Sequence, residues 1–198
     1  MKTVSGRKAS QKKYELDNLI RVIKENKCKT YLEIGARDGD TFYEIMKSLP
    51  VGSKGIAVDY PGASWGHSLS AESLKRVIST LKHEGYDVDL VLGDSTRQTI
   101  IDVIKKHSDS YDAILIDGDH RYDGVKQDWD NYGPMATKIV AFHDIWAVGA
   151  RQKNNPHLIV EVPKLWEELK PLHKHDEFID KEDEPSRPMG IGVLYIIP

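Results

Sequence analysis

Two apolar runs of the chain end in acidic and imidazole side chains, which are residue types that bind cations and accept protons. The run YDAILI leads into Asp117 and His120, and the run KIVAF leads into His143 and Asp144. In an open α/β sheet, ligands bind in the crevice beyond the carboxyl ends of the strands, so two neighbouring strands would bring these side chains together. The sequence therefore predicts a cation site beside a candidate proton acceptor.

A loop rich in small residues, EIGARDG, follows the first apolar strand. Gly35, Ala36 and Gly39 would let a ligand approach the backbone, and the N-terminus of the following helix would offer free N–H groups. Glu33 and Arg37 stand where the pyrophosphate of a dinucleotide needs an uncharged, glycine-rich surface. A cationic ligand without phosphate, such as S-adenosylmethionine, would be attracted by Glu33. A plain strand-to-helix turn is the alternative.

Two further strands also end in polar residues. Asp59 ends the second strand at the distance where an acidic residue accepts hydrogen bonds from ribose hydroxyls, although a turn aspartate before Pro61 is the alternative. Asp94 and Ser95 follow the third strand and could reach an exocyclic amine of a base, or could cap the next helix. Acidic strand ends in this order favour an adenosine ligand.

Short apolar segments alternate with amphipathic segments along the chain, which is typical of a parallel sheet covered on both faces. We therefore expect a Rossmann-like, doubly wound α/β fold with a mostly parallel, seven-stranded sheet and helices on both faces. The expected strands are residues 30–35, 54–60, 87–93, 111–117, 137–143, 175–179 and 191–197, and the expected helices are residues 14–27, 41–48, 71–84, 98–107, 122–132 and 162–170.

The length and composition predict a single domain. At 198 residues and 39% hydrophobic residues, the chain can build one complete core and is too short for two ordinary domains. Residues 1–13 are basic and almost free of apolar side chains, so we expect a flexible tail, with a nucleic-acid-binding arm as the alternative. The remainder of the chain, residues 14–198, would form that single domain.

Charge and cysteine content limit the partners and the compartment. A net charge of −3 argues against nucleic acid or an anionic membrane as the principal partner, so we expect small-molecule partners. Cys28 is the only cysteine, which excludes an internal disulfide. No apolar run approaches the length of a signal sequence or a membrane span, and we expect a cytoplasmic protein.

The motifs stand in an order that resembles class I S-adenosylmethionine-dependent methyltransferases. EIGARDG, VDYPG, LGDS, ILIDGDHRYDGV, IVAFHD and GIGVLY together cover roughly residues 31–196. The sequence is most similar to the branch of macrocin-type, metal-dependent sugar O-methyltransferases. IDGDH with a later FHD is the specific part of this resemblance, whereas the glycine loop is generic.

The resemblance implies a doubly wound sheet with an antiparallel last strand and a set of site residues. The implied metal ligands are Asp117, His143 and Asp144, and the implied catalytic base is His120. Magnesium is favoured by resemblance, although manganese or another divalent ion would also suit mixed oxygen and imidazole ligands. The expected contacts to S-adenosylmethionine are Glu33, Gly35, Ala36, Arg37, Gly39, Asp59, Asp94, Ser95 and Asp117.

The chain departs from the family pattern in three respects. Arg37 replaces a glycine that is usual in the loop, which bears on cofactor affinity. His143 stands where some relatives carry a carboxylate, which bears on the identity of the metal. A long additional domain for recognising a large substrate is absent from this chain, which bears on the acceptor.

The expected reaction is methylation of a hydroxyl on a small acceptor, a sugar or a natural product. A cation could coordinate the hydroxyl and lower its pKa, and His120 could remove the proton. The alternatives are a metal-independent small-molecule methyltransferase and a non-catalytic module that binds an adenosyl ligand. An NAD-dependent oxidoreductase is disfavoured by Glu33 and Arg37. The sequence leaves the acceptor open, and also whether the chain forms a homo-oligomer.

Overall fold

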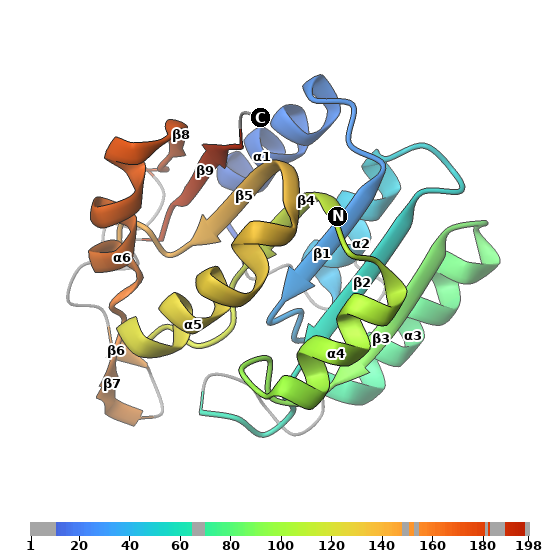
Figure 1. Ribbon diagram of the computed structural model, residues 1–198, viewed down its shortest axis with the longest axis horizontal. Helices are drawn as coiled ribbons and strands as arrows, with labels where there is room; N and C mark the ends of the chain where they lie inside the picture. Colours follow the sequence, from blue (N-terminus) through green and yellow to red (C-terminus); the bar gives the residue numbers. More distant parts are fainter. Residues whose placement is uncertain are drawn as a thin grey trace.

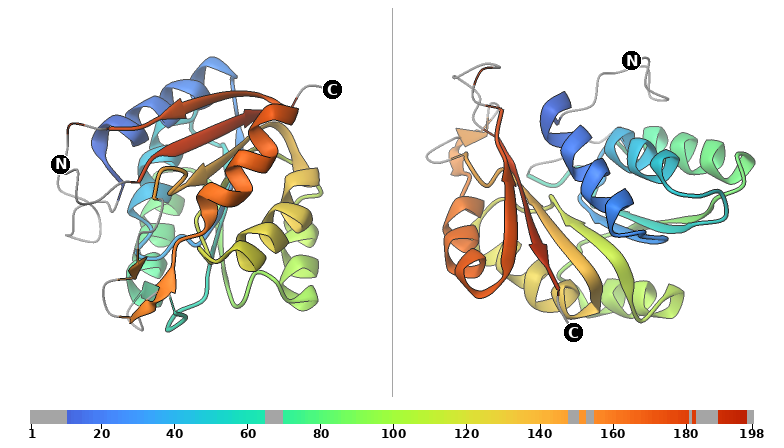
Figure 2. Two further views of the ribbon diagram at one scale, coloured as in Figure 1. Left: turned by 90° about the vertical axis from the view of Figure 1, so that its left-hand side faces the viewer. Right: turned by 90° about the horizontal axis from the view of Figure 1, so that it is seen from above.

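A seven-stranded sheet lies between two layers of helices in the computed structural model, which describes residues 11–64, 70–147, 151–152, 155–180, 182 and 189–196 (Figures 1 and 2). The strand order is β3-β2-β1-β4-β5-β9-β8, and the expected Rossmann-like fold is confirmed. The strands of this sheet are β1 (Thr30–Ile34), β2 (Lys54–Asp59), β3 (Asp87–Leu92), β4 (Tyr111–Ile116), β5 (Ala136–His143), β8 (Lys174–Phe178) and β9 (Ile191–Tyr195).

The helices connect these strands in alternation. They are α1 (Lys13–Glu25), α2 (Asp40–Ser48), α3 (Ser70–His83), α4 (Gln98–His107), α5 (Tyr122–Tyr132) and α6 (Val162–Leu169), with short 3₁₀ helices η1 (Gly133–Met135) and η2 (Lys170–Leu172). The first five strands pair in parallel, and β9 runs antiparallel between β5 and β8. The implied antiparallel last strand is therefore confirmed, and the carboxyl ends of β1 to β5 share one edge of the sheet.

Side chains alternate between the two faces of the sheet and build two apolar cores. On β1, Tyr31 packs into the core formed with α1, α2 and α3, whereas Leu32 and Ile34 pack into the core formed with α4, α5 and α6. The right-hand view of Figure 2 shows these helix layers on opposite faces of the sheet. No helix in the described part of the chain is both long and apolar enough to cross a membrane.

The structure differs from the sequence-based expectation at two places. A hairpin of β6 (Arg151–Gln152) and β7 (Asn155–Ile159) was not predicted, because these segments carry no alternating pattern. Gln11 and Lys12, expected in the flexible tail, are only 9% exposed, and Nζ of Lys12 donates to the carbonyl of Asp180 at 3.0 Å. The prediction of a tail is thus wrong for residues 11–13, since Lys13 begins α1, and residues 1–10 lie outside the described part.

Candidate functional site

Carboxylates and imidazoles meet where β4 and β5 end. Nδ1 of His120 lies 2.9 Å from Oδ2 of Asp144, and Nε2 of His120 lies 3.5 Å from Oδ1 of Asp117. Nδ1 of His143 lies 3.2 Å from Oδ1 of Asp117 and 3.5 Å from Oδ1 of Asp144. The parallel pairing of β4 with β5 brings the two strand ends together, so the expected clustering of these four residues is confirmed.

The charges in this cluster stabilise one another. Burial opposes protonation of His120, but hydrogen bonds to Asp117 and Asp144 outweigh burial and raise its pKa to about 9. For His143, burial is likewise outweighed by the two carboxylates, and its pKa is raised well above the usual range. Burial would raise the pKa values of Asp117 and Asp144, yet the two imidazoles hold both below the usual range. The charged forms of the carboxylates and of the imidazoles therefore favour one another.

Asp144 adopts an uncommon backbone conformation. Its φ is +62°, in the left-handed region that few residues other than glycine, asparagine and aspartate adopt. Backbone hydrogen bonds hold the next two residues, since the N–H groups of Ile145 and Trp146 donate to the carbonyls of Gly190 (3.3 Å) and Met189 (2.7 Å). The chain preceding β9 thus fixes the turn that carries the Asp144 carboxylate.

Three cluster residues could hold a metal ion together. One ligand atom from each of Asp117, His120 and Asp144 lies within 4.8 Å of the others. This group contains His120 in place of His143, which the resemblance had implied as the ligand. The His143 side chain is only 4% exposed and the His120 side chain 16% exposed, so His120 is the more accessible imidazole.

Gln11 reaches this cluster and Glu15 is influenced by the charge of His143, and the sequence predicted neither. Nε2 of Gln11 donates to Oδ2 of Asp117 at 3.0 Å, and Oε1 of Gln11 accepts a hydrogen bond from the Thr41 hydroxyl. Glu15 is fully buried on α1, and its Oε1 accepts from the backbone N–H of Asp180 at 3.2 Å. The one signal in the sequence was the position of Glu15 four residues before Leu19, on the apolar side of the expected helix.

The loop after β1 folds back onto β2. The N–H groups of Gly35 and Ala36 both donate to the carbonyl of Val58 at 2.9 Å, and the N–H of Gly39 donates to the carbonyl of Ala36. The N–H of Arg37 donates to Oδ1 of Asp59 at 3.0 Å. These four loop N–H groups therefore bind protein acceptors, whereas the expectation of free N–H groups concerned the N-terminus of the following helix, α2, and stays a prediction.

Glu33 is enclosed by the protein. It is 1% exposed, and its Oε2 accepts a hydrogen bond from the Tyr31 hydroxyl at 2.6 Å. Burial raises the pKa of Glu33 to about 8, an effect that the Tyr31 hydrogen bond only partly offsets. Burial thus favours the neutral form of Glu33, and the expected attraction of its charge for a cationic ligand stays a prediction.

Asp59 lies buried at the end of β2, as the sequence predicted. Its Oδ1 accepts from the Arg37 N–H, and its Oδ2 accepts from the Ser70 hydroxyl at 2.8 Å. Asp59 thus ties the loop after β1 to the start of α3.

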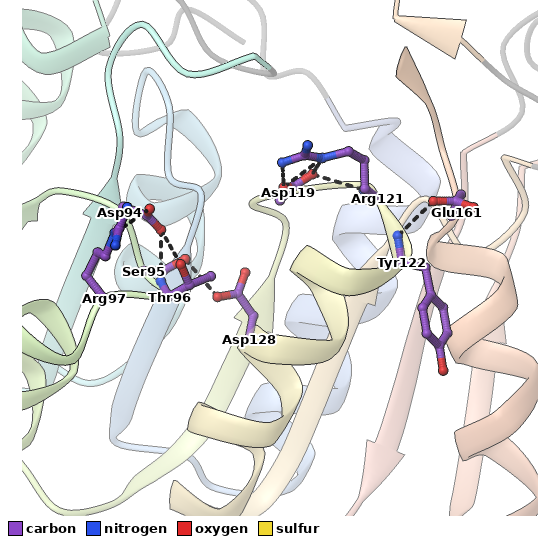
Figure 3. A network of polar contacts seen from close by, with 9 residues as sticks. All are labelled: Asp94, Ser95, Thr96, Arg97, Asp119, Arg121, Tyr122, Asp128 and Glu161. Carbon is purple, nitrogen blue, oxygen red and sulfur yellow. Dashed lines mark hydrogen bonds and ion pairs between the residues drawn. The ribbon is translucent and has the colours of Figure 1, made fainter. Parts of the chain in front are cut away.

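Asp94 and Ser95 make local contacts in the turn after β3 (Figure 3). Oδ1 of Asp94 accepts from the N–H of Thr96 at 3.0 Å and from its hydroxyl at 2.6 Å, and Oδ2 lies 3.3 Å from Nε of Arg97. The Ser95 hydroxyl donates to Oδ1 of Asp128 at 2.7 Å. Asp94 therefore stabilises its own turn, and the alternative of a helix cap is not realised, because the N-cap of α4 is Arg97 without a side-chain capping hydrogen bond.

Glu161 holds the loop that carries His120. Its N–H donates to the carbonyl of His120 at 2.7 Å, and its Oε2 accepts from the N–H of Tyr122 at 3.0 Å (Figure 3). Arg121, between these two contacts, pairs with Asp119. Glu161 thereby fixes the His120 backbone and supplies an acceptor to the first N–H of α5.

Comparison with solved structures identifies the fold. The O-methyltransferase TomG from Streptomyces achromogenes, in complex with S-adenosylmethionine, matches with a TM-score of 0.71 at 11% identity, over 96% of this chain and 82% of that chain. An O-methyltransferase from Bacillus cereus, in complex with S-adenosylhomocysteine, matches with a TM-score of 0.69 at 13% identity, over 95% and 83%. The N-methyltransferase NodS from Bradyrhizobium japonicum matches with a TM-score of 0.66 at 10% identity, over 92% and 94%.

These similarities show that the chain has the fold of class I methyltransferases. No protein-family model matches the sequence, and the comparison with curated proteins finds no match.

Proposed function

We propose that the protein is a methyltransferase that transfers a methyl group from S-adenosylmethionine to a hydroxyl of a small acceptor, with a divalent cation held at Asp117 and Asp144. The observation that carries this proposal is the cluster of two carboxylates and two imidazoles at the ends of β4 and β5. Its place in a fold shared with methyltransferases supports the choice of cofactor.

The polar strand ends fit the parts of S-adenosylmethionine in order. The carboxylate of Asp59 at the end of β2 would accept hydrogen bonds from the ribose hydroxyls. The turn at Asp94 and Ser95 would lie against the adenine, and the loop at Gly35 would face the methionine end. The three loops follow neighbouring strands, which is where a ligand binds in an open α/β sheet.

The cluster at Asp117 and Asp144 fits a divalent cation. Carboxylate oxygens are the ligands that magnesium prefers, and imidazole extends the range to manganese, iron or zinc. A bound divalent cation would act as a Lewis acid that lowers the pKa of a coordinated hydroxyl. We propose magnesium or manganese, and a sugar or natural-product hydroxyl as the acceptor.

His120 is the proposed base because it is the more accessible imidazole, and His143 is the proposed third ligand. A neutral imidazole is needed to accept a proton, whereas the two carboxylates favour the protonated form of His120. Neutralising the charges of Asp117 and Asp144 would bring this pKa down towards neutrality. The competing assignment makes His120 the ligand, because it completes the group of ligand atoms within 4.8 Å.

Binding and turnover measurements on two histidine variants separate these assignments. Under our assignment, His120→Ala binds Mn²⁺ nearly as well as the wild type but does not methylate, whereas His143→Ala loses Mn²⁺ affinity. The reverse pattern of Mn²⁺ binding would make His120 the ligand. Turnover is measured by mass spectrometry on a panel of sugars and phenols, with Mg²⁺, Mn²⁺ or a chelator. Full activity in the chelator would contradict the cation-dependent proposal.

A further inference from the structure

The carboxyl group of Asp128 is buried and takes no part in the proposed methyl transfer. Asp128 lies on α5 and is 0% exposed. Its Oδ1 accepts a hydrogen bond from the Ser95 hydroxyl at 2.7 Å, whereas Oδ2 is buried without a hydrogen-bond partner among the described residues. A buried acceptor left without a partner is costly, so its retention calls for an explanation.

The second oxygen of Asp128 faces the loop between β4 and α5. A methyl group built on Gly118 would lie 3.1 Å from Oδ2 of Asp128, so the carboxyl packs closely against the Gly118 backbone. Gly118 directly follows Asp117, one of the proposed cation ligands. One carboxyl group therefore contacts the turn after β3 through Ser95 and the loop after β4 through Gly118.

A second α5 residue holds the same turn. The hydroxyl of Tyr132, one helical turn after Asp128, donates to the carbonyl of Ser95 at 2.6 Å. Ser95 is thus fixed through its side chain and its backbone by a single helix. Figure 3 shows Asp128 pointing from α5 toward this turn, in which Asp94 and Thr96 make their own contacts.

Burial and the local charges favour the neutral form of the Asp128 carboxyl. Burial raises the pKa of Asp128 to about 7, the hydrogen bond from Ser95 opposes this, and the charges of Asp119 and Asp94 raise it further. Asp94 belongs to the turn after β3, and Asp119 belongs to the loop after β4. Both carboxylates act on Asp128, and an uncharged carboxyl there avoids adding repulsion.

We infer that Asp128 is a positioning residue that fixes the turn at Ser95 against the loop at Gly118, so that the turn is preformed for the adenine of the cofactor. This inference rests on the proposed function. Because Oδ2 is buried, Asp128 acts through Ser95 and Gly118 and does not touch the cofactor itself. A preformed turn lowers the conformational cost of binding, and this gain appears as ligand affinity.

The test is binding of S-adenosylhomocysteine to the full chain, measured by calorimetry with three variants. Asp128→Leu removes both oxygens and should weaken binding about tenfold, the loss expected for a hydrogen bond and its ordering effect. Asp128→Asn keeps one acceptor for Ser95 and should stay within about threefold of the wild type. Asp130→Asn changes an exposed carboxylate of the same helix and should not alter the affinity.

A second readout distinguishes positioning from a general loss of structure. Asp117 is held independently, by the Gln11 amide and by its own N–H donating to the carbonyl of Ile34 at 2.8 Å, so Mn²⁺ affinity should be unchanged in Asp128→Leu. Equal losses of ligand and Mn²⁺ binding would overturn the inference. If Asp128→Leu does not fold, Ser95→Ala takes its place and should bind S-adenosylhomocysteine more weakly than the wild type. Unchanged binding in Ser95→Ala would overturn the inference.

The two proposals fail in different ways. A wild-type protein that does not bind S-adenosylhomocysteine contradicts the proposed function. A wild type that binds it, with affinity equal to that of Asp128→Leu, contradicts only the role of Asp128.

Discussion

The side-chain amide of Gln11 donates a hydrogen bond to Oδ2 of Asp117, 3.0 Å away, across 106 residues of sequence. The same amide accepts a hydrogen bond from Thr41 at the start of α2. The segment preceding α1 therefore packs on the carboxyl edge of the sheet, against a residue proposed to bind the cation. A chain start expected to be flexible thus includes part of the site.

Replacing Gln11 should destabilise the protein. Gln11→Ala removes both hydrogen bonds of a buried amide, and each is worth about 1 kcal/mol, so we expect a loss of about 1–2 kcal/mol in the free energy of unfolding. Urea denaturation measures this loss. Gln127→Ala, at an exposed position of α5, is the matched control and should lie within about 0.5 kcal/mol of the wild type. Equal stability of the two variants would show that the Gln11 contacts do not persist in solution.

Asp144→Asn should abolish cation binding without disturbing the backbone. Asparagine tolerates the left-handed conformation that Asp144 adopts at φ +62°, but an amide lacks the charge of a carboxylate ligand. We expect the Mn²⁺ dissociation constant to rise about 100-fold or more, by analogy with losses of groups around metal sites. Calorimetry provides the measurement. The control is Asp176→Asn. It changes a carboxylate on β8 that accepts a hydrogen bond from the Tyr195 hydroxyl, and it should retain full Mn²⁺ affinity.

Glu33 should make the stability of the wild type fall as the pH rises. Burial raises its folded-state pKa from 4.5 to about 8, so the folded state retains a proton that the unfolded state loses. The contribution of this proton to the free energy of unfolding is fully present below about pH 4.5 and is lost as the pH rises through about 8. Glu33→Gln removes this titration, while its amide oxygen can still accept the Tyr31 hydrogen bond.

The stability difference between Glu33→Gln and the wild type isolates this group from other titrating residues. The difference should shift in favour of the variant by up to about 4 kcal/mol between pH 5 and pH 9, because one pKa unit corresponds to about 1.4 kcal/mol. Urea denaturation of both proteins at these two pH values gives the shift. A difference that does not change with pH would mean that Glu33 has an ordinary pKa in the folded protein.

Glu161→Ala should loosen the start of α5. The substitution removes the carboxylate that accepts the N–H of Tyr122 at 3.0 Å, and loss of such a helix-capping contact costs about 1 kcal/mol. Amide hydrogen exchange at Tyr122 should accelerate, and the free energy of unfolding should fall by about that amount. Glu167→Ala breaks an exposed ion pair with Lys170 and should cost less than about 0.5 kcal/mol. Similar costs for the two variants would count against the capping role.

Much of the fold follows from local patterns in the sequence. The apolar runs that form β1 to β5 and the helices between them carry their own periodicity, and parallel strand ends must share one edge. The cluster of Asp117, His120, His143 and Asp144 could therefore be predicted. Which imidazole binds the cation and which acts as the base could not be predicted. That assignment depends on side-chain conformations that bring His120 within reach of both carboxylates.

Contacts between distant segments account for what the sequence does not reveal. Gln11 stands in a polar segment without periodicity, and its partner lies in another element of the fold. Asp128 reads as a polar position of an amphipathic helix, and only its packing against Gly118 and Ser95 identifies it as buried. Burial likewise favours the neutral form of Glu33, a side chain that was expected to be charged. Its position at the end of β1 was predicted.

Calorimetric titration of the wild-type protein with S-adenosylhomocysteine, with Asp59→Asn as the variant and NAD⁺ as the comparison ligand, tests the central claim most directly. We predict one-to-one binding of S-adenosylhomocysteine, no binding of NAD⁺, and an affinity about tenfold weaker in Asp59→Asn, which loses a charged acceptor for the ribose hydroxyls. Absence of S-adenosylhomocysteine binding to the wild type, or preferential binding of NAD⁺, would contradict the assignment as a methyltransferase.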